Sequence, residues 1–216
     1  MTRNLFGDVA PISEDAEPLE GAVLLYGFAN DLAQQLVQCL EKVIAASPYR
    51  HMSVRGGHKM SVAMTNCGDL GWVSDEAGYR YDRLDPLTGR PWPAMPEPLR
   101  QLAVNAALAA GFGTFEPDAC LINRYEPGSQ MGLHQDKNEK DFSAPIVSVS
   151  LGLPAVFLFG GMRRSVRPRR IQLYSGDIVV WGGSQRLAYH GVARLAPGDH
   201  PLTGSCRINL TFRKAA

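Results

Sequence analysis

Two residues that can hold a metal ion stand close together in the second half of this sequence. They are His134 and Asp136, in the segment Leu-His-Gln-Asp. On an extended chain, residues i and i+2 project to the same side, so this imidazole and this carboxylate would converge. A turn aspartate beside a surface histidine is the competing interpretation, because a chain of this composition contains about 0.3 such pairs by chance. The pair therefore needs a further ligand before it indicates a metal site.

His190 is the best candidate for that third ligand. It lies in the segment Tyr-His-Gly, after a predicted strand over residues 178–181 and its glycine turn. Two histidines and one carboxylate occupy one face of an octahedral metal ion and leave three positions open, which is the ligand set of non-haem Fe(II) oxygenases. A structural role is the alternative for His190 taken alone. The three residues together predict a metal centre.

The last predicted strand alternates strictly between apolar and polar side chains. Its polar set is Arg207, Asn209, Thr211 and Arg213, and its apolar set is Ile208, Leu210 and Phe212. If the polar face lines a cavity, its two guanidinium groups could hold the ends of a small dicarboxylate, although about 20 Å of extended strand separates them. If that face meets water, both arginines are ordinary surface residues. Asn123 and Tyr125 share a face of an earlier strand and offer an amide and a phenol.

The elements that must position these residues are two helices followed by many short strands. We expect helices over residues 30–46, capped by Asn30 or Asp31, and over residues 98–110. Residues 52–95 are rich in Gly, Pro, Trp and Tyr and show no clear helix. Strands are expected over residues 119–125, 146–151, 156–160, 171–174, 178–181 and 208–213. This order favours a sandwich or a jelly roll over an alternating βαβ sheet.

Length and composition describe one globular chain. With 216 residues, 45% hydrophobic and 20% charged, the chain can bury a core and is not a disordered polypeptide. No apolar run approaches the ~18 residues of a membrane helix and no signal peptide is visible, so we expect a cytoplasmic protein. The four cysteines form no C-x-x-C pair, which favours reduced thiols over a disulfide scaffold. Nothing indicates an oligomer, and we expect a monomer.

The charge of the chain is distributed unevenly, although its net value is +1. Residues 1–20 contain five acidic residues and one basic residue, and we expect them to form an acidic arm outside a single domain of residues 21–216. The most basic stretch contains five arginines, at positions 163, 164, 167, 169 and 170. These arginines could contact phosphate groups, and a solvated basic loop is the alternative.

Longer segments of the sequence resemble a known family. Besides the metal motif and the Arg-x-Asn-x-Thr-x-Arg strand, they cover residues 60–66, 92–96, 117–125, 133–136, 146–152 and 209–213. The chain resembles the Fe(II)- and 2-oxoglutarate-dependent dioxygenases, and among them the AlkB-type oxidative nucleic-acid demethylases, from about residue 20 to Arg213. The resemblance implies a mainly β, α+β fold. Its double-stranded β-helix (jelly roll) core would span residues 115–213, with N-terminal helices packed on it and a nucleotide-recognition lid at residues 52–95.

The same resemblance implies a reaction and a role for each site residue. The enzyme would use O2 and 2-oxoglutarate to repair alkylated DNA or RNA, single-stranded DNA above all. It would demethylate 1-methyladenine and 3-methylcytosine, releasing formaldehyde, succinate and CO2. Fe(II) would be bound by His134, Asp136 and His190. The 2-oxoglutarate would be held by Asn123, Tyr125 and Arg207 at its distal carboxylate and by Asn209 and Arg213 toward the metal. The substrate would contact Met64, Trp72, Tyr79, Asn138, Ser148 and Arg164, with Tyr81 as a further aromatic residue of the lid.

The sequence departs from the pattern of this family at Asn138, where the family has an acid. An amide carries no charge to favour a cationic methylated base, so we expect a reduced preference for cationic lesions. His58 and Leu158 also differ near the implied pocket. Two other functions stay open at this point: an oxygenase with the same core that acts on a protein or a small molecule, and a non-catalytic jelly-roll module that holds a metal such as zinc. A zinc module gives no reason for Arg207 and Arg213 to share a face.

Overall fold

The computed structural model describes residues 16–19 and 21–216, and most of the expected acidic arm lies outside these residues. Fourteen strands and two α-helices make up the described fold. The helices are α1 (Ala33–Ala46) and α2 (Glu97–Ala109). No helix in the described ranges is long and apolar enough to cross a membrane.

Two antiparallel sheets form the body of the molecule. The major sheet has eight strands, in the order β1 (Ala16–Leu19), β2 (Ala22–Leu25), β12 (Ile178–Trp181), β9 (Ile146–Gly152), β14 (Arg207–Arg213), β7 (Ala119–Tyr125), β4 (Lys59–Gly68) and β3 (Arg50–Ser53). The minor sheet has four, in the order β11 (Arg169–Leu173), β10 (Ala155–Phe159), β13 (His190–Val192) and β8 (Met131–His134). This arrangement agrees with the expected mainly β jelly roll.

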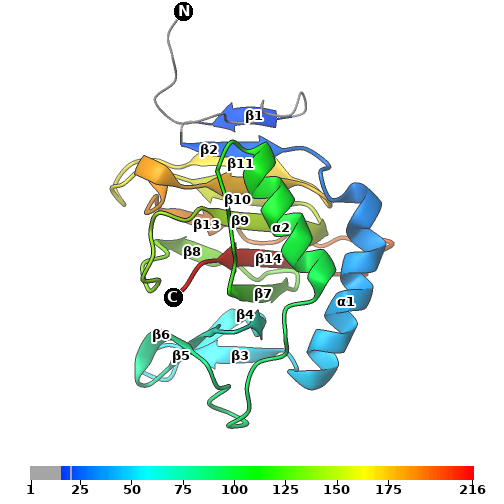
Figure 1. The fold of residues 1–216 in the computed structure, drawn as a ribbon, viewed down its shortest axis with the longest axis vertical. Helices are drawn as coiled ribbons and strands as arrows, with labels where there is room; N and C mark the ends of the chain where they lie inside the picture. The colour runs from blue at the N-terminus through cyan, green and yellow to red at the C-terminus, as the bar shows by residue number, and fades with distance from the viewer. Residues whose placement is uncertain (1–15, 20) are drawn as a thin grey trace, which may run out of the picture.

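The two faces of the major sheet bury different cores. Figure 1 shows both helices on one face of this sheet. There, Leu36 and Leu99 from the helices pack in one cluster with Leu210 and Phe212 of β14. The other face looks toward the minor sheet, and the cluster between the sheets includes Phe157, Phe159, Ile171, Val179 and Trp181. Since side chains alternate along a strand, the polar residues of β14 must point into the space between the sheets.

The helices follow the expected positions with one correction at the first N-terminus. The segment expected as one helix from residue 30 begins with a 3-10 turn, η1 (Asn30–Leu32), before α1 starts. Neither Asn30 nor Asp31 makes a capping hydrogen bond from its side chain, so the expected cap is wrong. The second helix ends before Gly111, whose φ of 82° lies in the left-handed region that glycine adopts without strain.

The segment of residues 52–95 divides between the major sheet and a separate hairpin. Strand β4 pairs with β7 from Ala63 to Gly68 and so belongs to the core sheet. Its polar residue Thr65 is buried, and its hydroxyl is satisfied there because it donates to the Ser47 carbonyl at 2.7 Å. Strands β5 (Gly71–Asp75) and β6 (Gly78–Asp82) form a two-stranded sheet of their own. Figure 1 shows this hairpin beside β3 and β4, at one end of the molecule.

Candidate active site

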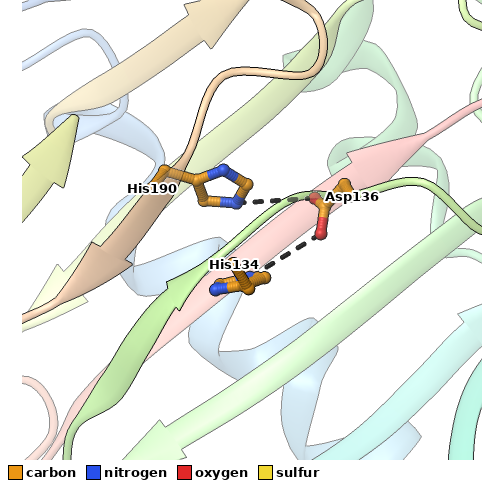
Figure 2. A group of neighbouring side chains, drawn as sticks. All are labelled: His134, Asp136 and His190. Carbon is orange, nitrogen blue, oxygen red and sulfur yellow. Dashed lines mark ion pairs between the residues drawn. The ribbon is translucent and has the colours of Figure 1, made fainter. Parts of the chain in front are cut away.

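Three metal-ligating side chains converge between the sheets, as the sequence predicts. His134 ends β8, His190 begins β13, and these two residues are register partners in the minor sheet. Asp136 follows β8 by two residues and points its carboxylate between the two rings, as Figure 2 shows. The Nε2 atoms of His134 and His190 each lie 3.7 Å from a carboxylate oxygen of Asp136. All three ligand atoms lie within 4.8 Å of one another, which suits a shared metal ion.

The hydrogen bonds of the two imidazoles leave the correct ring nitrogens for a metal. Nδ1 of His134 donates to the Gly132 carbonyl at 2.9 Å, and Nδ1 of His190 donates to the Ala188 carbonyl at 3.0 Å. Each ring then presents an unprotonated Nε2 to the centre of the site. Burial, with a further contribution from His134, lowers the pKa of His190 to about 4. His190 is therefore neutral at physiological pH, as a metal ligand must be.

A buried arginine holds the carboxylate ligand. Arg213 donates from Nε (2.9 Å) and from its terminal nitrogen NH2 (2.6 Å) to the Asp136 carboxylate. Burial alone would raise the pKa of Asp136, but Arg213 and the two imidazoles outweigh it and hold that pKa below its usual range. The carboxylate is thus ionised before any metal arrives, at the position where two histidines can share a cation with it.

The polar face of β14 lines an inner cavity of about 50 Å³ beside the three ligands. Arg207 is only 1% exposed, and its guanidinium lies over the Tyr125 ring at 5.1 Å. One terminal nitrogen donates to the Ser150 hydroxyl at 3.0 Å. Its Nε and its NH1 nitrogen have no hydrogen-bond partner in the structure of residues 16–19 and 21–216. Two buried cationic nitrogens without an acceptor fit the carboxylate of a bound anion, and this is the fit that a distal carboxylate of 2-oxoglutarate requires.

Asn123 and Asn209 link the two ends of this cavity. The Asn123 amide donates to Oδ1 of Asn209 at 3.3 Å, and the Asn209 amide donates to the Ser148 hydroxyl at 2.8 Å. Asn209 is thus held on both sides and fixed in orientation. Ser148 was expected among the substrate-contacting residues. The structure instead places it in the inner cavity, because β9 turns this side chain toward Asn209.

A second, outer pocket of about 310 Å³ opens beside His134. The rings of Trp72 and Tyr79, from the β5–β6 hairpin, stack at 5.6 Å with planes 15° apart. Tyr79 is 52% exposed although it is aromatic, so it is not a core residue. The lining also includes the expected residues Met64, Asn138 and Arg164. His134 and Arg213 line both pockets, so the outer pocket leads to the metal ligands.

Three further residues that the sequence analysis places near the implied pocket or its lid line neither pocket. The Tyr81 hydroxyl donates to Glu139 at 2.8 Å, and Tyr81 is not among the residues that line the outer pocket. His58 is exposed in the loop between β3 and β4, and Leu158 is half-buried on β10. Neither His58 nor Leu158 lines either pocket.

The sequence interpretation missed the residues that support the ligands from behind. Arg186, 2% exposed, donates to the main-chain oxygens of Asp136 (3.1 Å) and Ala144 (3.0 Å). The Gln135 amide donates to the Leu187 carbonyl at 2.6 Å. Glu139 is buried beside Arg186 and Arg213. These residues lie in irregular segments without a period-2 or helical pattern, where a charged side chain usually meets water.

Comparison with known proteins defines the class of this chain. Residues 21–213 match the model of the 2OG-Fe(II) oxygenase superfamily. The chain belongs to this family, and it is a dioxygenase that uses Fe(II), 2-oxoglutarate and O2. The two histidines and the carboxylate fit Fe(II), and the two arginines with unpartnered buried nitrogens fit the anion 2-oxoglutarate.

Individual relatives narrow the comparison. The chain is 55% identical over 213 residues to the alpha-ketoglutarate-dependent dioxygenase AlkB of Escherichia coli, covering 98% of this chain and 97% of that protein. It is 36% identical over 137 residues to the nucleic acid dioxygenase ALKBH1 of Mus musculus, covering 63% of this chain and 34% of that protein. The solved structure titled OsALKBH1 superimposes with a TM-score of 0.80 at 31% identity, covering 92% of this chain and 99% of that chain.

Proposed function

We propose that this dioxygenase demethylates N-methylated bases in nucleic acid, such as 1-methyladenine and 3-methylcytosine. One observation carries the proposal: an aromatic-walled outer pocket, large enough for a small ligand, leads directly to the candidate metal ligands. The relationship to AlkB and to a nucleic acid dioxygenase supports it. Demethylation would release formaldehyde, succinate and CO2.

In this proposal His134, Asp136 and His190 hold Fe(II). Their donor atoms already stand within 4.8 Å of one another, so little reorganisation is needed when the ion binds. Hydrogen bonds from the two Nδ1 atoms to main-chain carbonyls keep the rings in place. Bound together, the metal and 2-oxoglutarate would use O2 to supply the oxidising power that hydroxylates an N-methyl carbon, and the hydroxymethyl amine would then release formaldehyde.

The inner cavity would take 2-oxoglutarate. Arg207 offers its unpartnered Nε and NH1 nitrogens to the distal carboxylate, and Tyr125 and Asn123 line the same cavity. Asn209 and Arg213 would face the other end, beside the metal ligand Asp136. Because these groups are buried and fixed by hydrogen bonds, they orient the dicarboxylate without losing much side-chain freedom.

The outer pocket would take the methylated base. Trp72 and Tyr79 supply stacking surface, worth about 1–3 kcal/mol per base, while His134 lies at the pocket floor and Met64 in its wall. A base must leave its own stack to enter, and that step costs least when the base is damaged or single-stranded. We therefore infer that alkylated single-stranded DNA is the main substrate, with double-stranded DNA and RNA as further substrates.

The arginine-rich loop would hold the backbone of the strand. Arg163, Arg164 and Arg167 are exposed, and Arg164 also lines the outer pocket, with its guanidinium 5.9 Å from the Tyr189 ring centre. A basic loop at the mouth of a base pocket meets phosphate groups on either side of the inserted nucleotide.

The test is formaldehyde release from an oligonucleotide that carries one 1-methyladenine. Purified protein receives Fe(II), ascorbate and 2-oxoglutarate, with the His134→Ala variant as the control. We expect formaldehyde and succinate in equal amounts from the wild type and neither from the variant. Succinate without formaldehyde would retain the oxygenase and refute the nucleic-acid substrate. If neither product forms in folded, iron-loaded protein, 1-methyladenine in an oligonucleotide is refuted as the substrate.

A further inference from the structure

Arg213 contacts a second carboxylate besides the candidate metal ligand that it holds. Its Nε lies 2.9 Å from Asp136 and also 3.3 Å from Oε1 of Glu139. Both nitrogens that contact Asp136 reach the same carboxylate oxygen, so Asp136 alone leaves the guanidinium plane free to turn. The ion pair with Glu139 meets Nε from a second carboxylate and so restrains that plane.

Glu139 is the point where three elements meet. Its side chain is 1% exposed, and its neighbours are Tyr81 on β6, Arg186 after η2 (Gly183–Gln185) and Arg213 on β14. A buried carboxylate is strongly destabilising unless it is paired and hydrogen-bonded. The four charges of Asp136, Glu139, Arg186 and Arg213 sum to zero. Removing any one of these four charges would therefore leave an unpaired charge buried in the cluster.

Tyr81 connects this charge network to the hairpin. It donates its hydroxyl to Glu139 at 2.8 Å, and burial raises its pKa well above the usual value, so the hydroxyl keeps its proton. In the hairpin register, Tyr81 stands directly opposite Trp72. Tyr79 lies two residues before it, on the same face. The residue that touches Glu139 therefore sits beside the two rings that wall the outer pocket.

Several contacts attach the hairpin to the rest of the molecule, among them hydrogen bonds from Ser74 to the Ser53 carbonyl and from Trp92 to the Asp82 carbonyl. Strands β5 and β6 pair only with each other among the described strands, and an isolated two-stranded hairpin is marginally stable. On the side of β4, Asn66 holds the main chain of Trp72 with two hydrogen bonds of 3.0 Å. On the side of the metal ligands, Tyr81 and Glu139 make the short contact, beside a longer one of 3.5 Å from Asn138 to the Tyr79 carbonyl.

We propose that Glu139 and Tyr81 are positioning residues that couple the base-binding hairpin to the metal centre. Glu139 orients Arg213 against Asp136, and the hydrogen bond from the Tyr81 hydroxyl to Glu139 links this orientation to the position of the hairpin. Filling the metal and 2-oxoglutarate sites then steadies the hairpin, and a base held by the hairpin strengthens those sites by the same factor. This coupling goes beyond the proposed reaction and does not depend on which base is the substrate.

The test measures amide hydrogen exchange in the peptide that covers residues 71–82, without and with Mn²⁺ plus 2-oxoglutarate. Neither substrate nor turnover is needed, so failure of this proposal is distinguishable from failure of the proposed function. In the wild type we expect the two ligands to slow exchange about tenfold, the effect of one hydrogen bond to a charged group. In Tyr81→Phe, at saturating Mn²⁺ and 2-oxoglutarate, we expect this slowing to fall below about twofold.

Two further variants complete the design. Tyr174→Phe makes the same chemical change at an exposed tyrosine outside the site, and it should keep the wild-type slowing. Glu139→Gln should lose the slowing and also weaken Mn²⁺ binding about tenfold, because Arg213 is no longer oriented. If Glu139→Gln does not fold, Tyr81→Phe decides. A wild type without ligand-dependent slowing, or a Tyr81→Phe variant that keeps it, overturns the proposal.

Discussion

Arg207 illustrates how one residue can be unfavourable for the fold and necessary for the site. Its guanidinium is buried, burial lowers its pKa, and two of its three nitrogens lack a partner among the described residues. A buried charge without full pairing destabilises the folded state, and a bound anion removes that penalty. If Arg207 binds the cosubstrate as proposed, the cosubstrate in turn stabilises the buried guanidinium.

Arg207→Met tests this assignment at the residue scale. We expect the ligand-free variant to melt at or above the wild-type temperature, because an incompletely paired buried charge is gone. The additional stabilisation that 2-oxoglutarate gives in the presence of Mn²⁺ should disappear. Thermal unfolding with and without ligands measures both effects. Arg124→Met, on the same sheet but with a half-exposed side chain, is the matched control and should change neither. A large loss of ligand-free stability would contradict the assignment.

Asn138 is the second residue with a separable prediction. It lines the outer pocket with an exposed amide, and the carboxylate among the lining residues is Asp136, which Arg213 already holds. We expect Asn138→Asp to raise kcat/KM for cationic bases relative to neutral ones, such as 1-methylguanine, by about twofold to fivefold, the effect of an exposed ion pair. Asn138→Leu removes the amide without adding charge and should not produce this gain. An unchanged ranking in Asn138→Asp would count against the charge argument.

At the scale of elements, the arginine loop and the hairpin face the same pocket from different parts of the chain. The hairpin supplies stacking rings, and the loop between β10 and β11 supplies exposed cations. Stacking is insensitive to salt, whereas phosphate contacts release counterions and depend strongly on it. Varying the salt concentration therefore distinguishes the contribution of the hairpin to binding from that of the arginine loop.

Replacing Arg163, Arg164 and Arg167 with Gln should change the salt dependence of binding. With about 0.7 per phosphate contact on a single strand, the slope of log K against log salt should become about 2 units shallower. Fluorescence anisotropy with a labelled single-stranded oligonucleotide measures it. Lys42→Gln, an exposed cation on α1, should leave the slope unchanged. A wild-type affinity that does not vary with salt would remove the loop from the interface.

At the scale of the whole molecule, the candidate metal and 2-oxoglutarate sites lie between the two sheets. The candidate metal ligands come from the minor sheet and the segment after β8, while the residues proposed to bind the anion come from the major sheet. Ligands that bridge both sheets stabilise only the folded arrangement. Binding should therefore appear as global stabilisation of the folded chain, in addition to its local effect on the hairpin.

Mn²⁺ with 2-oxoglutarate should raise the melting temperature of the whole chain. At 100 times the dissociation constant the gain is about 2.7 kcal/mol, or about 5–10 °C for a chain of this size. Differential scanning fluorimetry gives the shift for each ligand and for both. His190→Ala should lose the response to Mn²⁺ and most of the response to 2-oxoglutarate. Full stabilisation by 2-oxoglutarate in that variant would show that the cosubstrate does not reach the metal.

The sequence by itself determined the parts of this protein that depend on local periodicity and spacing. The period-2 pattern located β14, and the spacing of His134, Asp136 and His190 predicted a shared metal site that the structure assembles. The apolar stripes located both helices. Local rules suffice here because alternation and helical periodicity are properties of the chain itself.

Only the tertiary structure decided which face of each strand meets which neighbour. Strand β14 could have shown its arginines to water, but it lies between β9 and β7 with its apolar face under the helices, so Arg207 and Arg213 turn inward. The same packing places Ser148 with Asn209 and brings Glu139 to Arg213 from a distant part of the chain. Period-2 alternation determines only that the two faces of a strand differ in polarity. Which face is buried depends on what covers it, and that is set by residues far away in the sequence.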